Sequence, residues 1–311
     1  LSTISGQTVM VDYTVTGGTA TGGGIDYTLA IGTLTFTAGT TTQNIALTVA
    51  DDGLDETNET IQITLSNPLN ATLGANTDHT YTILDEDATP TVAFSATTSS
   101  GAESVTAVTI PVSLSAASGQ TVTVDYAVTG GTATGGGVDY TLASGTLTFT
   151  AGTTTQNIAI TVVNDALDEA NETIQITLSN PTNATLGANT VHTYTITDED
   201  AAPTVVFNAA SSSGAESVTS VTIPVSLSAA SGQTITVDYA VTGGTATGGG
   251  VDYTLASGTL TFTAGTISQN IAITVINDAL DEANETIQIT LSNPTNATLG
   301  ANTVHTYTIT D

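Results

Sequence analysis

Residues 122–137 read Val-Thr-Val-Asp-Tyr-Ala-Val-Thr-Gly-Gly-Thr-Ala-Thr-Gly-Gly-Gly, and they carry the clearest structural signal in the chain. The first half alternates apolar with small or polar residues, a period of two that is typical of a half-buried β-strand. The glycines that follow indicate a turn. Similar alternation recurs at 108–114, 147–149, 158–162, 174–178 and 192–196. About seven short strands without a helical pattern predict an all-β fold, a two-sheet antiparallel sandwich.

The chain is a tandem array of three copies of this pattern. Val-Asp-Tyr ends at Tyr13, Tyr126 and Tyr239, which are 113 residues apart, and residues 114–198 differ from 227–311 at only four positions. Repeats of this length are whole domains, because solenoid units have periods of about 20–50 residues. We predict repeat 1 at 1–89, repeat 2 at 90–202 and repeat 3 at 203–311. Short acidic linkers join them and restrict their relative freedom.

The two outer repeats are shorter than the middle one. Leu1 aligns with Leu114, so repeat 1 has no counterpart of residues 90–113, and Asp311 aligns with Asp198, the first residue of the acidic linker. Two explanations stay open for repeat 1. The sequence is cut from a longer array, or another subunit supplies the absent strand and pairs the open sheet edge.

Acidic residues without cationic partners are the main chemical feature. The chain has 29 Asp and Glu, no Lys or Arg, and a net charge of −29. All acids except Asp12, Asp78, Asp125 and Asp238 fall at recurring positions in loops and linkers, which the alternating strands bring to one end of each sandwich. Two like charges 4 Å apart repel by roughly 4 kcal/mol at an effective dielectric of about 20. Oxygen ligands without cysteine favour Ca²⁺ as the neutralising ion over zinc or copper.

The composition excludes several classes of function. The net charge argues against nucleic acid or an anionic membrane as a partner, and no apolar run is long enough to insert into a membrane. The absence of cysteine excludes disulfides and thiolate metal sites. No nucleophile and base pattern is visible, so we expect no enzyme.

A family resemblance rests on several motifs in combination. The run from Val124 to Tyr140, then Gly-Thr-Leu-Thr-Phe at 145–149, Ile-Thr-Val-Val-Asn-Asp at 160–165 and Asp-Glu-Ala-Asn-Glu-Thr at 168–173 resemble a Calx-beta domain. The resemblance covers nearly the whole chain, three times over. It implies immunoglobulin-like β-sandwiches, each of which binds calcium at one pole through inter-strand loops and its final acidic run. The large bacterial surface proteins and adhesins that carry this module are the nearest analogy.

The resemblance also implies the calcium ligands. In repeat 1 they are Asp26, Asp51, Asp52, Glu56, Glu59, Asp85, Glu86 and Asp87. In repeat 2 they are Glu103, Asp139, Asp165, Glu169, Glu172, Asp198, Glu199 and Asp200. In repeat 3 they are Glu216, Asp252, Asp278, Glu282, Glu285 and Asp311.

One departure from the family pattern concerns the paired aspartates. Calcium-sensing members carry two aspartates where repeats 2 and 3 have Asn164-Asp165 and Asn277-Asp278, and only repeat 1 keeps Asp51-Asp52. An asparagine offers one neutral oxygen in place of a carboxylate. The neighbouring acids Asp55, Asp168 and Asp281 are candidates to compensate as extra ligands.

Two functions are consistent with these features. The first is an extracellular, cell-surface or secreted, structural or adhesive protein, a stalk or fibre whose repeats set its length and whose calcium stiffens the joints. Its partners would be neighbouring copies of the repeat, in tandem or by donor-strand or lateral assembly into a filament, and a cell-surface or matrix ligand. The alternative is a calcium-sensing regulatory module that reorients its domains when calcium binds. Near-identical neighbouring repeats favour the first, because distinct sensing tasks drive repeats to diverge.

Overall fold

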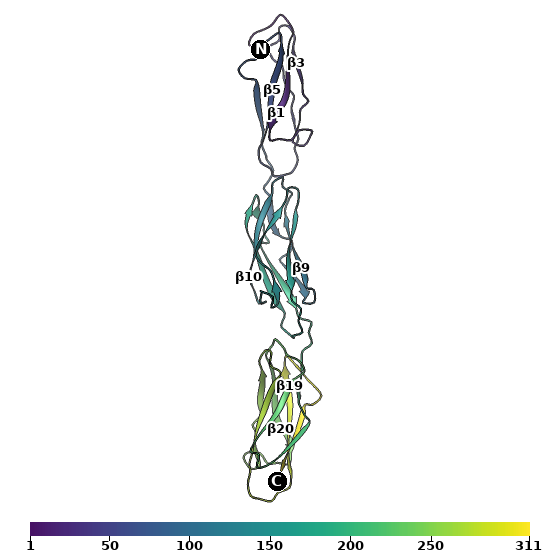
Figure 1. The fold of residues 1–311 in the computed structure, drawn as a ribbon, viewed down its shortest axis with the longest axis vertical. Coiled ribbons are helices and arrows are strands. Elements are labelled where there is room, and N and C mark those ends of the chain that lie inside the picture. Colours follow the sequence, from purple (N-terminus) through teal and green to yellow (C-terminus); the bar gives the residue numbers. More distant parts are fainter.

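The computed structural model describes residues 1–311 as three β-sandwiches that follow one another along a single long axis (Figure 1). The prediction of a tandem all-β array is confirmed. All regular secondary structure is β-strand, and no helix is long and apolar enough to cross a membrane.

Repeat 2 is a complete sandwich of two five-stranded sheets. One sheet has the order β12-β10-β14-β16-β8 and the other has the order β11-β13-β9-β7-β15. The strands are β7 (Thr91–Phe94), β8 (Thr98–Ala102), β9 (Ala107–Leu114), β10 (Val122–Gly131), β11 (Tyr140–Thr141), β12 (Gly145–Phe149), β13 (Thr155–Val162), β14 (Glu172–Thr182), β15 (Thr185–Leu186) and β16 (Val191–Thr197).

Repeat 3 has the same architecture. Its sheets have the orders β18-β26-β24-β20-β22 and β21-β23-β19-β17-β25. The strands are β17 (Thr204–Phe207), β18 (Ser211–Ala215), β19 (Ser220–Leu227), β20 (Ile235–Gly244), β21 (Tyr253–Thr254), β22 (Gly258–Phe262), β23 (Ser268–Val275), β24 (Glu285–Thr295), β25 (Thr298–Leu299) and β26 (Val304–Thr310).

The period of two in the sequence explains the core of each complete sandwich. In β10, Val122 and Val124 are fully buried, and across the sandwich Ile158 and Ile160 point inward from β13. These residues belong to a cluster of 18 buried side chains that includes Phe149, which has no exposed surface. Burying one such side chain contributes about 1.5–3 kcal/mol relative to leaving it in water. The core therefore fixes the sheet register, and with it the end of the sandwich at which each loop emerges.

Two edge pairings differ from the predicted antiparallel pattern. In repeat 2, β8 runs parallel to β16 and β15 runs parallel to β7; in repeat 3, β18 and β26 and likewise β17 and β25 are parallel in the same way, while the other strand pairs are antiparallel. The sequence did not reveal β8, because Thr-Ser-Ser-Gly-Ala has no apolar alternation. It is placed by its pairing with β16 and by a close contact: a Cβ added to Gly101 would lie 2.5 Å from the Tyr194 hydroxyl, so a larger residue would force that side chain to shift.

Repeat 1 has a smaller core. It contains a four-stranded sheet, β3-β1-β5-β6, and a two-stranded ribbon of β2 and β4. Nothing takes the place of β7, β8 and β9, and Tyr81 is 41% exposed where the equivalent Tyr194 is 3% exposed. The strands are β1 (Val9–Gly18), β2 (Tyr27–Thr28), β3 (Gly32–Phe36), β4 (Thr48–Val49), β5 (Glu59–Leu69) and β6 (Asp78–Ile83).

Candidate metal centre

Five strand ends converge on one pole of repeat 2. Glu103 directly follows β8, and Asp198 directly follows its parallel neighbour β16. Glu172 opens β14, which pairs antiparallel with β16, so Glu172 lies opposite Ile196 near the end of that strand. Asp139 precedes β11, and the loop with Asp165 leaves β13. The sheet topology therefore gathers carboxylates from distant parts of the sequence.

Backbone hydrogen bonds fix the loops that carry these acids. Asp139 Oδ2 accepts a bond from Thr134 N–H at 2.5 Å, and Asp139 N–H donates to the Thr134 carbonyl at 3.0 Å. Asp165 Oδ1 accepts from Leu167 N–H at 2.8 Å. Each acid thus keeps a defined direction.

Two groups of three carboxylates result in repeat 2. The first group is Asp139, Glu169 and Glu172, and the second is Glu103, Asp165 and Asp200; within each group the ligand oxygens lie within 4.8 Å of one another. The two groups adjoin, because Glu103, Asp165 and the first group line a single cavity together with Asp198.

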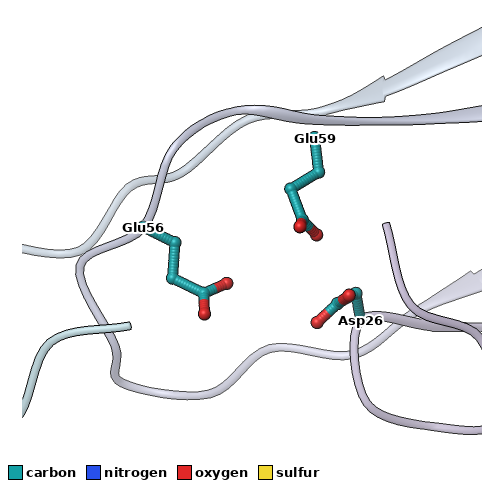
Figure 2. A group of neighbouring side chains, drawn as sticks. All are labelled: Asp26, Glu56 and Glu59. Atoms are coloured by element: carbon teal, nitrogen blue, oxygen red, sulfur yellow. The ribbon is translucent and has the colours of Figure 1, made fainter. Parts of the chain in front are cut away.

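Repeat 1 has the counterpart of the first group. The carboxylates of Asp26, Glu56 and Glu59 point toward one another in Figure 2, and their oxygens also lie within 4.8 Å. The other predicted ligands of repeat 1 line the same cavity, namely Asp51, Asp52, Asp85, Glu86 and Asp87.

Repeat 3 places its predicted ligands around one cavity but forms no group of three carboxylates with oxygens within 4.8 Å of one another. One cavity is lined by Glu216, Asp252, Asp278, Glu282, Glu285 and Asp311. Asp281 lies outside it and is exposed.

Three predicted ligands of repeats 1 and 2 lie elsewhere. Asp55 and Asp168 do not join the carboxylate groups; both are buried at the joints with the following repeats. Glu199 turns toward the end of β8, where its Oε1 accepts a bond from Ser104 N–H at 3.0 Å. Alternation along a strand does not determine which way a loop side chain points, so the sequence could not separate these acids from the ligands.

The structure adds to the site one position of the repeat that the sequence analysis did not assign, an asparagine that is Asn58 in repeat 1 and Asn171 in repeat 2. Asn171 Oδ1 accepts a hydrogen bond from Asp198 N–H at 3.1 Å, and Asn58 makes the same bond to Asp85 N–H at 3.0 Å. These asparagines hold the acidic linker against the loop that carries the glutamates. Their position next to Glu59 and Glu172 in the sequence was the available signal.

The donor set of repeat 2 fits a hard divalent cation. Glu103 Oε1, Asp198 Oδ1 and Asp200 Oδ2 are buried and have no hydrogen-bond partner. A buried charged oxygen without a partner is costly, and the chain has no Lys or Arg to supply one. Calcium binds six to eight oxygens, mostly from carboxylates, carbonyls and water. The unsatisfied oxygens and the convergent carboxylates therefore match calcium in charge and in ligand type.

Crowding of the acids changes their protonation. Burial, reinforced by Asp200, raises the pKa of Glu103 to about 7, and burial, reinforced by Asp139, raises the pKa of Glu172 to about 7. Burial raises the pKa of Glu56 in repeat 1 and of Glu282 in repeat 3, with a further contribution from neighbouring carboxylates. Without a cation, Glu103 and Glu172 therefore hold their protons well above the ordinary glutamate pKa of 4.5.

Acids outside the groups behave in the opposite way. Asp125 lies on the exposed face of the sheet, where Thr146 Oγ1 donates to it at 2.6 Å and Asn180 Nδ2 donates at 3.1 Å. These two bonds lower its pKa. Asp125 is therefore satisfied by its neighbours in the sheet, and it serves as a control for experiments on the metal centre.

We expect the calcium-free protein to lose stability as the pH rises from about 4.5 to about 7. In that window folded Glu103 and Glu172 keep their protons, with pKa values of about 7. The unfolded chain has already lost them, so it binds fewer protons and the free energy of unfolding falls with pH. Urea denaturation in calcium-free buffer at several pH values measures this slope. A free energy of unfolding that rises across the window would contradict the assignment.

Comparison with known proteins agrees with this architecture. The Calx-beta domain family matches residues 2–87, 85–200 and 198–311. No curated protein matches the sequence significantly.

Solved structures resemble the chain at low identity. The structure of CBD12 from CALX1.2 is 21% identical, covers 70% of this chain and 99% of its own, and has a TM-score of 0.35. The calcium binding domain CBD12 of CALX1.1 is 22% identical, covers 68% of this chain and 82% of its own, and has a TM-score of 0.35. The protocadherin γB4 extracellular domain is 14% identical, covers 96% of this chain and 44% of its own, and has a TM-score of 0.32. Since the family matches all three repeats, the chain belongs to the Calx-beta domain family.

Proposed function

We propose that this protein is a non-enzymatic, extracellular structural or adhesive stalk whose joints are stiffened by calcium. Calx-beta domains are non-catalytic calcium-binding modules. In this chain Asp139, Glu169 and Glu172 would hold one ion in repeat 2, and Glu103, Asp165 and Asp200 a second. Millimolar calcium outside cells suits a module of this kind, since extracellular calcium sites bind at about 10⁻⁴–10⁻³ M.

The observation that supports this proposal most strongly is the position of Asp200. This residue belongs to the acidic linker between repeats 2 and 3, yet its carboxylate lies with Glu103 and Asp165 at the pole of repeat 2. An ion bound there would tie the linker to the sandwich that it leaves. Without an ion, repulsion among these acids would drive the linker away from the pole. Calcium would therefore shorten the free length of the linker and hold consecutive repeats in line.

Small-angle X-ray scattering of the full chain tests the proposal. With millimolar calcium we expect the maximum dimension of a rod, as the end-to-end arrangement in Figure 1 implies. After chelation we expect a smaller radius of gyration and a broader distribution of interatomic distances, because the released linkers bend. Identical scattering curves in calcium and in chelator would contradict a stiffening role.

Calcium sensing is the alternative function, and one contact favours it. Glu169 packs against Gly232 of the following repeat, so an ion that moves Glu169 would act directly on the joint. A sensor would change from one defined angle between repeats to another when calcium binds, and the same scattering experiment would then show two rigid shapes. We also propose three kinds of partner for this protein. They are other copies of the chain, a strand from another subunit that pairs with the sheet edge of repeat 1, and a cell-surface or matrix ligand.

A further inference from the structure

Two buried aspartates lie at the joints between repeats, outside the carboxylate groups. Asp55 is 6% exposed and Asp168 is 7% exposed, and each forms an isolated bridge with a serine of the following repeat, Ser118 or Ser231. In the second joint Ser231 Oγ lies 2.9 Å from Asp168 Oδ2, and Gln233 Nε2 donates to the same oxygen at 3.3 Å. A buried carboxylate with no cation needs such donors.

The first joint is built in the same way. Gly119 N–H donates to the Asp55 carbonyl at 3.1 Å, and Gln120 Nε2 donates to Asp55 Oδ2 at 3.3 Å. Thr89, in the linker, adds a bond from its hydroxyl to Asp55 Oδ1 at 3.2 Å. Both side-chain oxygens of Asp55 are thus satisfied by neutral donors.

The loop that receives the aspartate has the same internal hydrogen bonds in repeat 1, where Gly6 has no contact with another repeat among residues 1–311. In repeat 1 the equivalent Ser-Gly-Gln is residues 5–7; there Gln7 N–H donates to Ser5 Oγ at 3.0 Å, and Gly39 N–H donates to the Ser5 carbonyl at 3.0 Å. The docked loop 118–120 makes the same two hydrogen bonds, at 3.0 and 2.9 Å. The receiving surface is therefore pre-organised, and docking orders little that was free before.

The glycine of the loop lies in close contact with the glutamate of the preceding repeat. A Cβ added to Gly119 would lie 2.6 Å from Glu56 Cγ, and one added to Gly232 would lie 2.8 Å from Glu169 Cγ, so a larger residue would force the glutamate side chain to shift. At Gly6, the equivalent position of repeat 1, a Cβ would have no atom within 4 Å. None of these three glycines has a positive φ, so the constraint comes from the neighbouring repeat and not from the backbone conformation.

We propose that the Ser-Gly-Gln loop at the head of each repeat is a docking surface for the Asp-Glu dipeptide at the tail of the preceding repeat, and that this contact sets the angle at which consecutive repeats meet. Asp55 and Asp168 accept the hydrogen bonds, and the adjoining glutamate packs on the glycine. The partner of the loop is defined by its chemistry: a carboxylate that accepts from a hydroxyl and an amide, followed by a glutamate side chain that lies against the glycine. The contact fixes the angle of the joint, whereas the calcium proposed above limits how far the linker bends away from it.

A measured distance between repeats 2 and 3 tests the inference. The chain has no cysteine, so Ser144→Cys and Ser257→Cys, at two exposed positions, give one label in each repeat. With saturating calcium we expect a narrow distribution of label distances by double electron–electron resonance. Gly232→Ala and Asp168→Ala should each broaden it, because the contact that sets the angle of the joint is lost.

Matched controls separate the joint from the loop itself. Gly6→Ala makes the same substitution in repeat 1, and Asp281→Ala removes the equivalent exposed aspartate of repeat 3; neither residue lies at the joint between repeats 2 and 3, so both should leave the distribution narrow. Melting curves confirm that each variant is folded. A broad distribution for the unsubstituted chain with saturating calcium would overturn the inference, as would narrow distributions for both Gly232→Ala and Asp168→Ala. If calcium does not alter the scattering, the proposed function is contradicted, but this inference is not affected.

Discussion

Calcium should raise the melting temperature of this protein by roughly 10 °C when it is present at about 100 times its dissociation constant. One ion that binds only the folded state then adds about 2.7 kcal/mol to the free energy of unfolding. The physical reason is the set of buried oxygens without partners, Glu103 Oε1, Asp198 Oδ1 and Asp200 Oδ2, which an ion would satisfy. Differential scanning calorimetry in calcium and in chelator measures the shift.

Magnesium provides the control for this experiment. It is smaller, demands a regular octahedron and gives up its water reluctantly, so a carboxylate site for calcium should gain little from it. An equal shift from both ions would indicate general screening of the net charge of −29. An unchanged melting temperature in calcium would contradict the proposed metal centre.

Replacing Asp139 by Asn together with Glu169 by Gln should weaken the calcium response of repeat 2, because it disables one of the two carboxylate groups of that repeat. The two residues supply two of the three carboxylates in their group. The neutral amides keep the shapes of the side chains but bind a dication weakly. The same change should stabilise the calcium-free repeat near pH 7, because it removes two like charges that now crowd Glu172.

Hydrogen exchange resolves this effect repeat by repeat. Peptides that contain Val122 or Val163 report on repeat 2, since repeat 3 has Ile235 and Ile276 at those places. Calcium should slow exchange in repeat 2 of the doubly substituted chain less than it does in repeat 2 of the unsubstituted chain, and should slow exchange in repeat 3 equally in both. Asp125→Asn, which removes an acid of the sheet face, should preserve the calcium response of both repeats. A weaker response in the control, or an undiminished response of repeat 2 in the double variant, would refute the ligand assignment.

The sequence was sufficient for the sandwich and for most of the carboxylate groups. Alternating apolar residues such as Val122 and Val124 are buried as predicted, because a strand with one buried face has a period of two. Strand ends then determine which loops share a pole, and this brings Asp139 and Glu172 together across 33 residues of sequence. The family match and the structure both follow from these repeated patterns.

The joints could not be predicted in the same way. Asp165 and Asp168 are three residues apart in one acidic loop, yet Asp165 faces the metal centre and Asp168 faces the next repeat. The difference comes from the packing of two domains against each other, which no local pattern encodes. The Ser-Gly-Gln loop likewise looks like an ordinary turn until Glu169 is seen against Gly232.

The most direct test is a crystal structure of the chain grown with calcium, with anomalous scattering used to locate the ions. We predict an ion between Asp139, Glu169 and Glu172 and another between Glu103, Asp165 and Asp200. Each ion should lie about 2.3–2.6 Å from its carboxylate oxygens. Carboxylates that point apart into solvent at saturating calcium, with no anomalous density between them, would contradict the account.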